Sequence, residues 1–168
     1  LLLSFSIAYI IKNTNQKKIL YFWGIIFLIV SLDILYEYIL GENVLGYKSG
    51  YHGRIASFTG DELIIGNFFA ALSLIGLSFI FYKSNKNILY IFLVSLIFIL
   101  VSFLIGERSN FLKTSIIIFL FIFFTFKFRL KYIIAFLLLV LASIILVINF
   151  NKDYKMRYYN QMVGLNKE

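Results

Sequence analysis

The sequence predicts an all-α membrane protein, built as a bundle of transmembrane helices, and two observations lead to that fold class. Of its 168 residues, 61% are hydrophobic and only 14% are charged, and the mean hydropathy is +0.91, far outside the range of soluble domains. The apolar residues also form long continuous runs, not the residue-by-residue alternation of a barrel strand. Because a helix satisfies its own backbone hydrogen bonds in lipid, such runs favour helical spans.

The apolar runs divide the chain into elements in a regular order. Residues 1–11 are too short to cross a bilayer and are interpreted as the end of a truncated N-terminal helix. About five later runs approach or reach the roughly 17 to 25 residues that span a hydrocarbon core, and each predicts a full span. These runs are 19–40, 63–82, 88–105, 111–126 and 132–150. Residues 151–168 are polar and predict the start of an external loop, so that 1–168 forms one membrane domain.

The charges in the connections indicate how the spans are oriented. In one set of connections every charged residue is basic, namely 12–18, 83–87 and 127–131. The others, 41–62, 106–110 and 151–168, also carry acidic residues. By the positive-inside rule the first set is cytoplasmic, which places the second set outside. The net charge of +8 is spread over these connections and forms no single patch, so nucleic acid is not an expected partner.

Arg54 begins the more polar of two motifs at the predicted outer face. The following Thr59-Gly-Asp-Glu62 fits a capping box immediately before an apolar run, which predicts a helix start there. A helix N-terminus favours an anion, and an arginine beside it strengthens that preference. The alternative is structural, because Asp61 and Glu62 already lie at this helix start and would pair with Arg54.

Arg108 lies in the second motif, Gly106-Glu-Arg-Ser-Asn110, a short turn between two predicted spans. Ser109 or Asn110 is expected to cap the following helix, and Glu107 and Ser109 to support the arginine. A guanidinium group at this place suits planar, bidentate recognition of phosphate or carboxylate. An ordinary interfacial arginine in a tight turn is the alternative.

Three further ionisable residues are candidates for the same site. Asp33 and Glu37 lie one helical turn apart near the outer end of the first full span, and intramembrane acids generally face a bundle interior or a water-filled cavity. We expect an arginine partner for Asp33 and a structural role, orienting Arg54 or Arg108, for both acids. His52 is the only histidine and a weak candidate for a general base. One histidine and no cysteine provide no metal-ligand cluster.

Together, the two motifs resemble the O-antigen polymerase and O-antigen ligase family. The residues that carry the resemblance are Arg54-Ile-Ala-Ser-Phe-Thr-Gly-Asp-Glu-Leu-Ile-Ile-Gly-Asn67 and Gly106-Glu-Arg-Ser-Asn-Phe-Leu112, within a similarity over roughly 20–168. It implies a metal-independent glycosyltransferase without a cofactor in the bacterial inner membrane. Its donor would be an undecaprenyl-diphosphate-linked glycan bound at the periplasmic face, and its acceptor a glycan or lipid A-core. The family assigns the pyrophosphate to two arginines, here Arg54 and Arg108.

The resemblance also limits the assignment. The family's general base is a histidine in a large periplasmic loop, which would fall beyond Glu168, so His52 does not inherit that role. Two other classes of function remain open on the residues alone. A transporter or flippase of an anionic lipid-linked substrate would also need arginines in a polar cavity. A scaffold subunit without a site would tolerate substitution of Asp33, Arg54 and Arg108.

Overall fold

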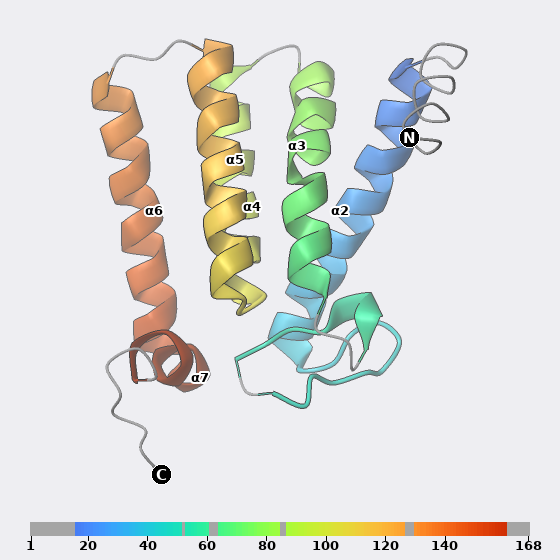
Figure 1. The fold of residues 1–168 in the computed structure, drawn as a ribbon, viewed down its shortest axis with the longest axis vertical. Coiled ribbons are helices and arrows are strands. Elements are labelled where there is room, and N and C mark those ends of the chain that lie inside the picture. The colour runs from blue at the N-terminus through green and yellow to red at the C-terminus, as the bar shows by residue number, and fades with distance from the viewer. Residues whose placement is uncertain (1–15, 52, 61–63, 85–86, 127–129, 161–168) are drawn as a thin grey trace, which may run out of the picture.

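The computed structural model describes residues 16–51, 53–60, 64–84, 87–126 and 130–160. Within these ranges the chain forms helices and loops and contains no strand, which confirms the all-α class. The long helices lie side by side (Figure 1): α2 (Gln16–Leu40), α3 (Ile65–Lys83), α4 (Ile88–Leu104), α5 (Arg108–Phe126) and α6 (Leu130–Phe150). Shorter turns are η1 (Ser57–Thr59), α7 (Lys152–Lys155) and the π-helical η2 (Met156–Asn160).

Fewer helices are suited to cross a membrane than the sequence predicts. Among the described residues, α2, α3 and α5 are long and apolar enough, and α6 followed by α7 and η2 makes a fourth only if this bent pair is one span. The prediction of five full spans is therefore too high. α4 has 17 residues, or about 26 Å at 1.5 Å per residue, which is short for a hydrocarbon core of about 30 Å.

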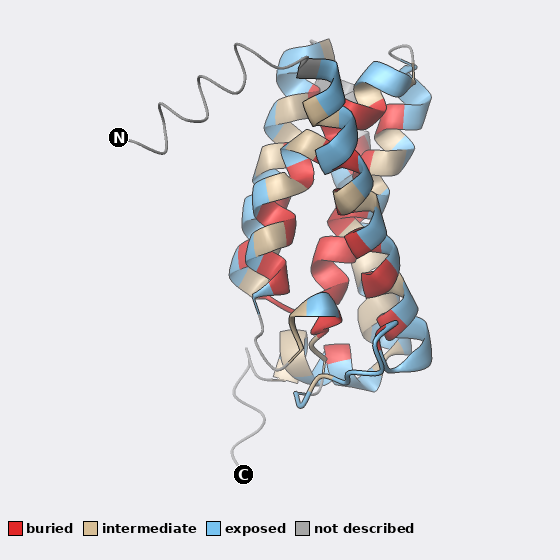
Figure 2. Cartoon of the chain, turned by 90° about the vertical axis from the view of Figure 1, so that its right-hand side faces the viewer, coloured by how far each residue is buried: buried red, intermediate tan, exposed pale blue. Residues whose placement is uncertain are grey.

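The core lies where α3 packs against α2, α4 and α5. Phe27 of α2 meets Phe69 of α3 and Phe98 of α4, with ring centroids 4.8 and 4.9 Å away. At Gly76 a Cβ atom would overlap the ring of Phe27, so this glycine lets α2 and α3 approach. Figure 2 shows the buried residues on the inward faces of the helices, while many large apolar side chains stay exposed on the outer faces.

Two predicted helix caps are wrong. The hydroxyl group of Thr59 donates to the carbonyl oxygen of Ala56 at 2.6 Å within η1, and α3 begins later, after Ile64, without a side-chain cap. In the second motif, α5 already begins at Arg108, so Ser109 and Asn110 lie inside its first turn. Thr59 thus bonds within its own turn, and the early start of α5 leaves Ser109 and Asn110 beyond the N-cap position.

The polar connections gather at one end of the bundle. The connection from α2 to α3, the turn from α4 to α5, and α7 lie together at the lower end in Figure 1, and the connection from α3 to α4 lies at the opposite end. Each helix crosses from one end to the other, so both arginine motifs meet at the same end. The candidate site is built there.

Candidate functional site

Asp33 and Glu37 fix the loop that carries Arg54, although both acids lie on α2. One oxygen of Glu37 accepts from the backbone N–H of Ala56 at 3.0 Å, and the other from that of Ser57 at 2.5 Å. Asp33 accepts from the Ser57 hydroxyl at 2.5 Å and from the Val44 N–H at 3.0 Å. Both acids are buried, so these donors offset the cost of taking two carboxylates out of water.

This arrangement corrects the prediction of an arginine partner for Asp33. Within the part of the chain that the structure describes, neither Asp33 nor Glu37 makes an ion pair or hydrogen bond with Arg54 or Arg108. Backbone N–H groups take the place of guanidinium because the loop folds back over the end of α2. The acids thus support Arg54 through the loop backbone. Ser57, which both acids contact, has a positive φ of 49°, a conformation that residues other than glycine rarely adopt.

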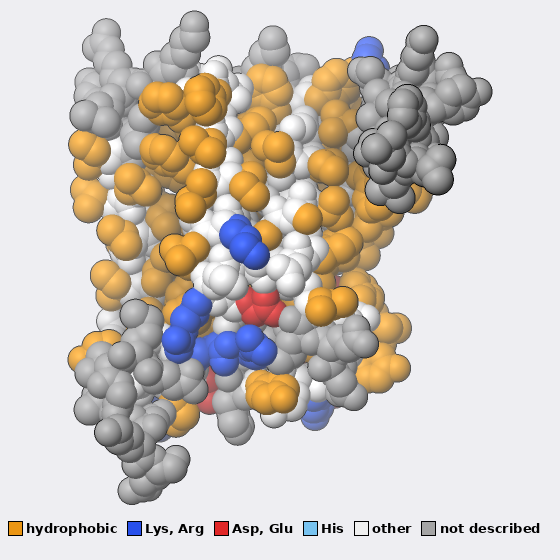
Figure 3. Space-filling model, in the orientation of Figure 1, with side chains coloured by type: hydrophobic (Ala, Val, Ile, Leu, Met, Phe, Trp, Pro, Cys, Tyr) orange, Lys and Arg blue, Asp and Glu red, His pale blue; other side chains and the backbone are white. Residues whose placement is uncertain are grey.

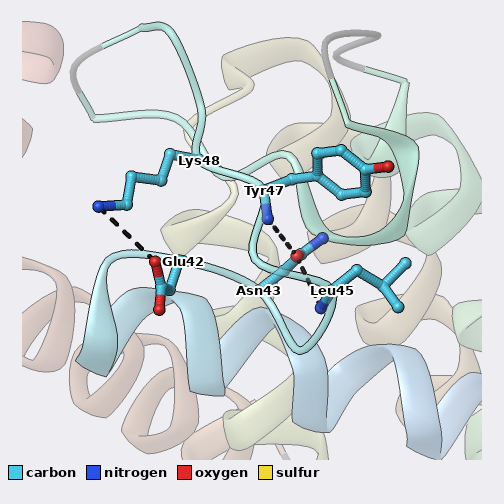
Figure 4. A network of polar contacts seen from close by, with 5 residues as sticks. All are labelled: Glu42, Asn43, Leu45, Tyr47 and Lys48. Atoms are coloured by element: carbon cyan, nitrogen blue, oxygen red, sulfur yellow. Dashed lines mark hydrogen bonds and ion pairs between the residues drawn. The ribbon is translucent and has the colours of Figure 1, made fainter.

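Asn43 organises the other half of the loop (Figure 4). Its side-chain oxygen accepts from the N–H groups of Leu45 at 3.0 Å and Tyr47 at 2.8 Å, and its amide group donates to the Ser57 carbonyl oxygen. At the surface of the same loop, Lys48 and Glu42 form an ion pair of 3.6 Å. Asn43 is buried, so the loop is held from inside as well as by the acids of α2.

The two sequence motifs touch through their glycines. Gly106 has a φ of +80°, and a Cβ atom there would overlap the carbonyl oxygen of Gly53. The N–H of Ile55 donates to the carbonyl oxygen of Ile105 at 3.2 Å. Only glycine satisfies both the left-handed backbone and the close approach at Gly106. The contact brings Arg54 beside the first residue of α5, which is Arg108.

A third segment closes over this contact. The chain bends by 110° between α6 and the α7–η2 segment, and two tyrosine hydroxyls then bind backbone carbonyl oxygens in the last turn of α4. Tyr154 donates to the carbonyl oxygen of Leu104, and Tyr158 to that of Phe103 at 3.1 Å. The Tyr158 ring also stacks on Phe103 with centroids 4.3 Å apart.

Arg157 is brought to the two motifs by this docking. Its Nε donates to the carbonyl oxygen of Gly106 at 2.5 Å, and its own carbonyl oxygen accepts from Arg108. Burial first, and then the neighbouring charges of Arg54 and Arg108, lower the pKa of Arg157. Arg157 is thus close enough to Arg54 and Arg108 to be repelled by both.

The basic residues line one pocket of about 620 Å³. Its lining residues are Arg54, Asn67, Glu107, Arg108, Ser109, Asn110, Lys113 and Arg157. Figure 3 shows this cluster of Lys and Arg side chains near the lower end of the molecule, with an acidic patch beside it. Four cations against one acid make the pocket strongly positive.

Only some of the polar groups that line the pocket have hydrogen-bond partners within the described part of the protein. Glu107 accepts from the amide of Asn110, and Asn110 in turn accepts from Lys113 at 3.1 Å. The guanidinium of Arg54 lies 6.0 Å from the centroid of the Tyr51 ring, and its buried Nε has no hydrogen-bond partner among the described residues. A buried unsatisfied donor is costly, so an acceptor in this pocket would stabilise it.

An apolar groove of about 590 Å³ continues from the basic pocket along the outer surface of the bundle. Asn67 and Lys113 line both. Beyond them the groove lies between α3 and α5 and is lined by Ala70, Ala71, Ile116 and Ile117. A ligand with an anionic head and an apolar tail would fit the two parts together.

The structure brings together four of the residues predicted for the site: Arg54, Glu107, Arg108 and Ser109. Asp33 and Glu37 lie behind the loop, while His52, Asp61 and Glu62 fall outside the described residues. Arg157, Asn110 and Lys113 were missed. A cation in a tail assigned to the same face, flanked by Tyr154 and Tyr158, was the available signal for Arg157.

Comparison with protein-family models, curated proteins and solved structures gives no match to this chain. The resemblance to the polymerases and ligases therefore rests on its motifs alone. Among the described residues no group of three His, Cys, Asp or Glu side chains is placed to hold a metal ion.

Proposed function

We propose that this chain provides the donor site of a membrane glycosyltransferase that takes a diphosphate-linked glycan on a polyprenyl lipid. One observation carries the proposal: Arg54, Arg108 and Arg157 line a single pocket at the end of the helices. A diphosphate offers several oxygens and more than one negative charge, which suits converging guanidinium forks. Burial, and then the charges of Arg54 and Arg108, lower the pKa of Arg157, and such an anion would offset the repulsion between these charges.

The apolar groove supports a lipid-linked donor over a soluble nucleotide sugar. It shares Asn67 and Lys113 with the basic pocket and leads away between α3 and α5. The first isoprenoid units of a polyprenyl chain would lie there with their diphosphate among the arginines. A nucleotide would place a polar base and ribose against Ala71 and Ile116, at a cost in desolvation.

In the proposed reaction the arginines act on the leaving group. As the anomeric carbon passes from the diphosphate to an acceptor hydroxyl group, negative charge grows on the departing phosphate oxygen. Donors already directed at that oxygen stabilise the transition state more than the ground state. The acceptor would be a glycan or lipid A-core, at the periplasmic face of a bacterial inner membrane.

The position of the pocket supports the enzyme over a transporter. Secondary transporters bind substrate near the middle of the bilayer, between repeated halves. Here the arginines come from a loop, the first residue of α5 and the η2 turn, all at one end of the bundle. A lipid-linked substrate held there exposes its sugar to water, where an acceptor can reach it.

The test is glycan transfer from an undecaprenyl-diphosphate-linked oligosaccharide by the membrane-embedded protein. Arg54→Ala and Arg108→Ala are each expected to lower the transfer rate by about 10²- to 10³-fold, the range for removing one preorganised donor. Arg54→Lys should also lose most activity, because it keeps the charge but lacks the fork. Lys48→Ala is the matched control, since Lys48 is an exposed cation of the same loop that pairs with Glu42. Normal transfer by both alanine variants would refute the proposal.

A further inference from the structure

A second, smaller pocket of about 220 Å³ lies on the other side of Arg54. It is formed by the last turn of α2 with Tyr38, by loop residues 49–51 and 53–55, and by the start of α7 with Asn151 and Tyr154. Arg54 lines this pocket and the basic one. The two therefore lie next to each other, separated by one arginine side chain.

The chemistry of this small pocket differs from that of its neighbour. Three tyrosines line it, Tyr38, Tyr51 and Tyr154, with the first and last in edge contact at a centroid distance of 5.9 Å. Its charged residues are Glu37 and Asp153 against Arg54, so it has no excess of positive charge to attract a second phosphate. Aromatic faces beside amide, hydroxyl and carboxylate groups suit a neutral ligand with many hydroxyl groups.

We propose that this pocket holds a single sugar ring beside the diphosphate. The inference rests on the proposed function, because it takes the basic pocket to hold the diphosphate. The volume of about 220 Å³ is below the roughly 300 to 1,000 Å³ of pockets for drug-sized ligands, which limits the occupant to one ring. Its polar lining at the outer end of α2 excludes the lipid tail, which has its own groove between α3 and α5.

The sugar has two possible sources with the same chemistry. It is either the ring joined to the donor diphosphate or a ring of the acceptor. Arg54 touches both pockets, so in either case it would lie beside the bond that is exchanged. The selectivity of the enzyme for its sugar would then depend on Tyr38, Tyr51 and Asn151.

The experiment measures binding to the protein in lipid nanodiscs with two kinds of probe. Farnesyl diphosphate reports on the basic pocket alone, and farnesyl diphosphates bearing glucose, galactose or N-acetylglucosamine add the ring. For a donor sugar, at least one glycosylated probe should bind about tenfold more tightly than farnesyl diphosphate, the equivalent of about 1.4 kcal/mol. For an acceptor sugar, one of the free monosaccharides should bind only after saturation with farnesyl diphosphate.

A pair of tyrosine variants locates the effect. Tyr38→Ala should remove the sugar-dependent binding and leave the affinity for farnesyl diphosphate unchanged. Tyr36→Ala is the matched control, because Tyr36 is an exposed tyrosine of the same helix that does not line the pocket. Tight, Arg108-dependent binding of farnesyl diphosphate with no gain from any sugar would overturn this inference and leave the proposed function intact. Absence of farnesyl diphosphate binding would refute the proposed function itself.

Discussion

Glu37 and Asp33 provide a sharp test of the loop, because their partners differ in one respect. Glu37 accepts from two backbone N–H groups, and Asp33 from one N–H and the Ser57 hydroxyl. A hydroxyl group can rotate and accept a hydrogen bond, but a backbone N–H cannot. Asp33→Asn therefore keeps both bonds in a neutral form. Glu37→Gln must turn its NH₂ group toward one N–H and lose that bond.

The magnitude follows from this difference. Both variants remove a buried carboxylate, so the gain from avoided desolvation is similar and largely cancels between them. A buried N–H left without an acceptor costs about 1 to 3 kcal/mol. Glu37→Gln should therefore destabilise the loop by about 1 to 3 kcal/mol more than Asp33→Asn.

Hydrogen exchange of the Ala56 and Ser57 amides measures this cost directly. At 1.4 kcal/mol per tenfold change, exchange in Glu37→Gln should be about 5- to 150-fold faster than in Asp33→Asn. Exchange in α3, away from the loop, is the internal control and should be unchanged. Equal exchange in the two variants, or faster exchange in Asp33→Asn, would show that the acids do not hold the loop in this way.

Three other predictions concern the same end of the molecule. Gly106→Ala should abolish diphosphate binding. Gly46 has the same φ of +80° but no atom within 4 Å of an added Cβ, so Gly46→Ala should cost only about 1 to 2 kcal/mol of backbone strain. An equal loss of diphosphate binding in the two variants would contradict the contact between Gly106 and Gly53. Asn43→Ala removes the acceptor of two loop N–H groups and should destabilise the loop by about 1 to 3 kcal/mol. Limited proteolysis between Glu42 and Tyr51 should then become faster, and an unchanged rate would contradict this prediction. Burial raises the pKa of Tyr158 from 10.0 to about 12, so the folded state holds this proton more tightly. The resulting stability is complete below pH 10 and is lost from there to about pH 12; a melting temperature that stays flat over this range would refute it.

The helices could be predicted from the sequence because continuous apolar runs leave a chain in lipid little choice of structure. The alternation of these helices also predicts that Arg54 and Arg108 reach the same end. Neither argument depends on detailed side-chain packing. The number of spans was overestimated because apolar length alone does not separate α4, at 17 residues, from a longer span.

The partners of the polar groups could not be predicted in the same way. A carboxylate accepts from guanidinium or from backbone N–H, and only the path of the loop over α2 decides that Glu37 binds Ala56 and Ser57. The arrival of Arg157 depends on the 110° bend after α6 and on two tyrosine hydroxyls binding the end of α4. Such contacts join segments far apart in the sequence, and local patterns do not contain them.

The docking of η2 has a consequence for how the protein is made. Arg108 and Arg157, which meet in the pocket, are 49 residues apart in the chain. Contacts of such long sequence separation form late because a large loop must close first. During synthesis, α2 to α5 are already complete while Arg157 has yet to emerge. Helices α2 to α5 therefore assemble before the cation cluster exists, and the basic pocket forms only after they have packed.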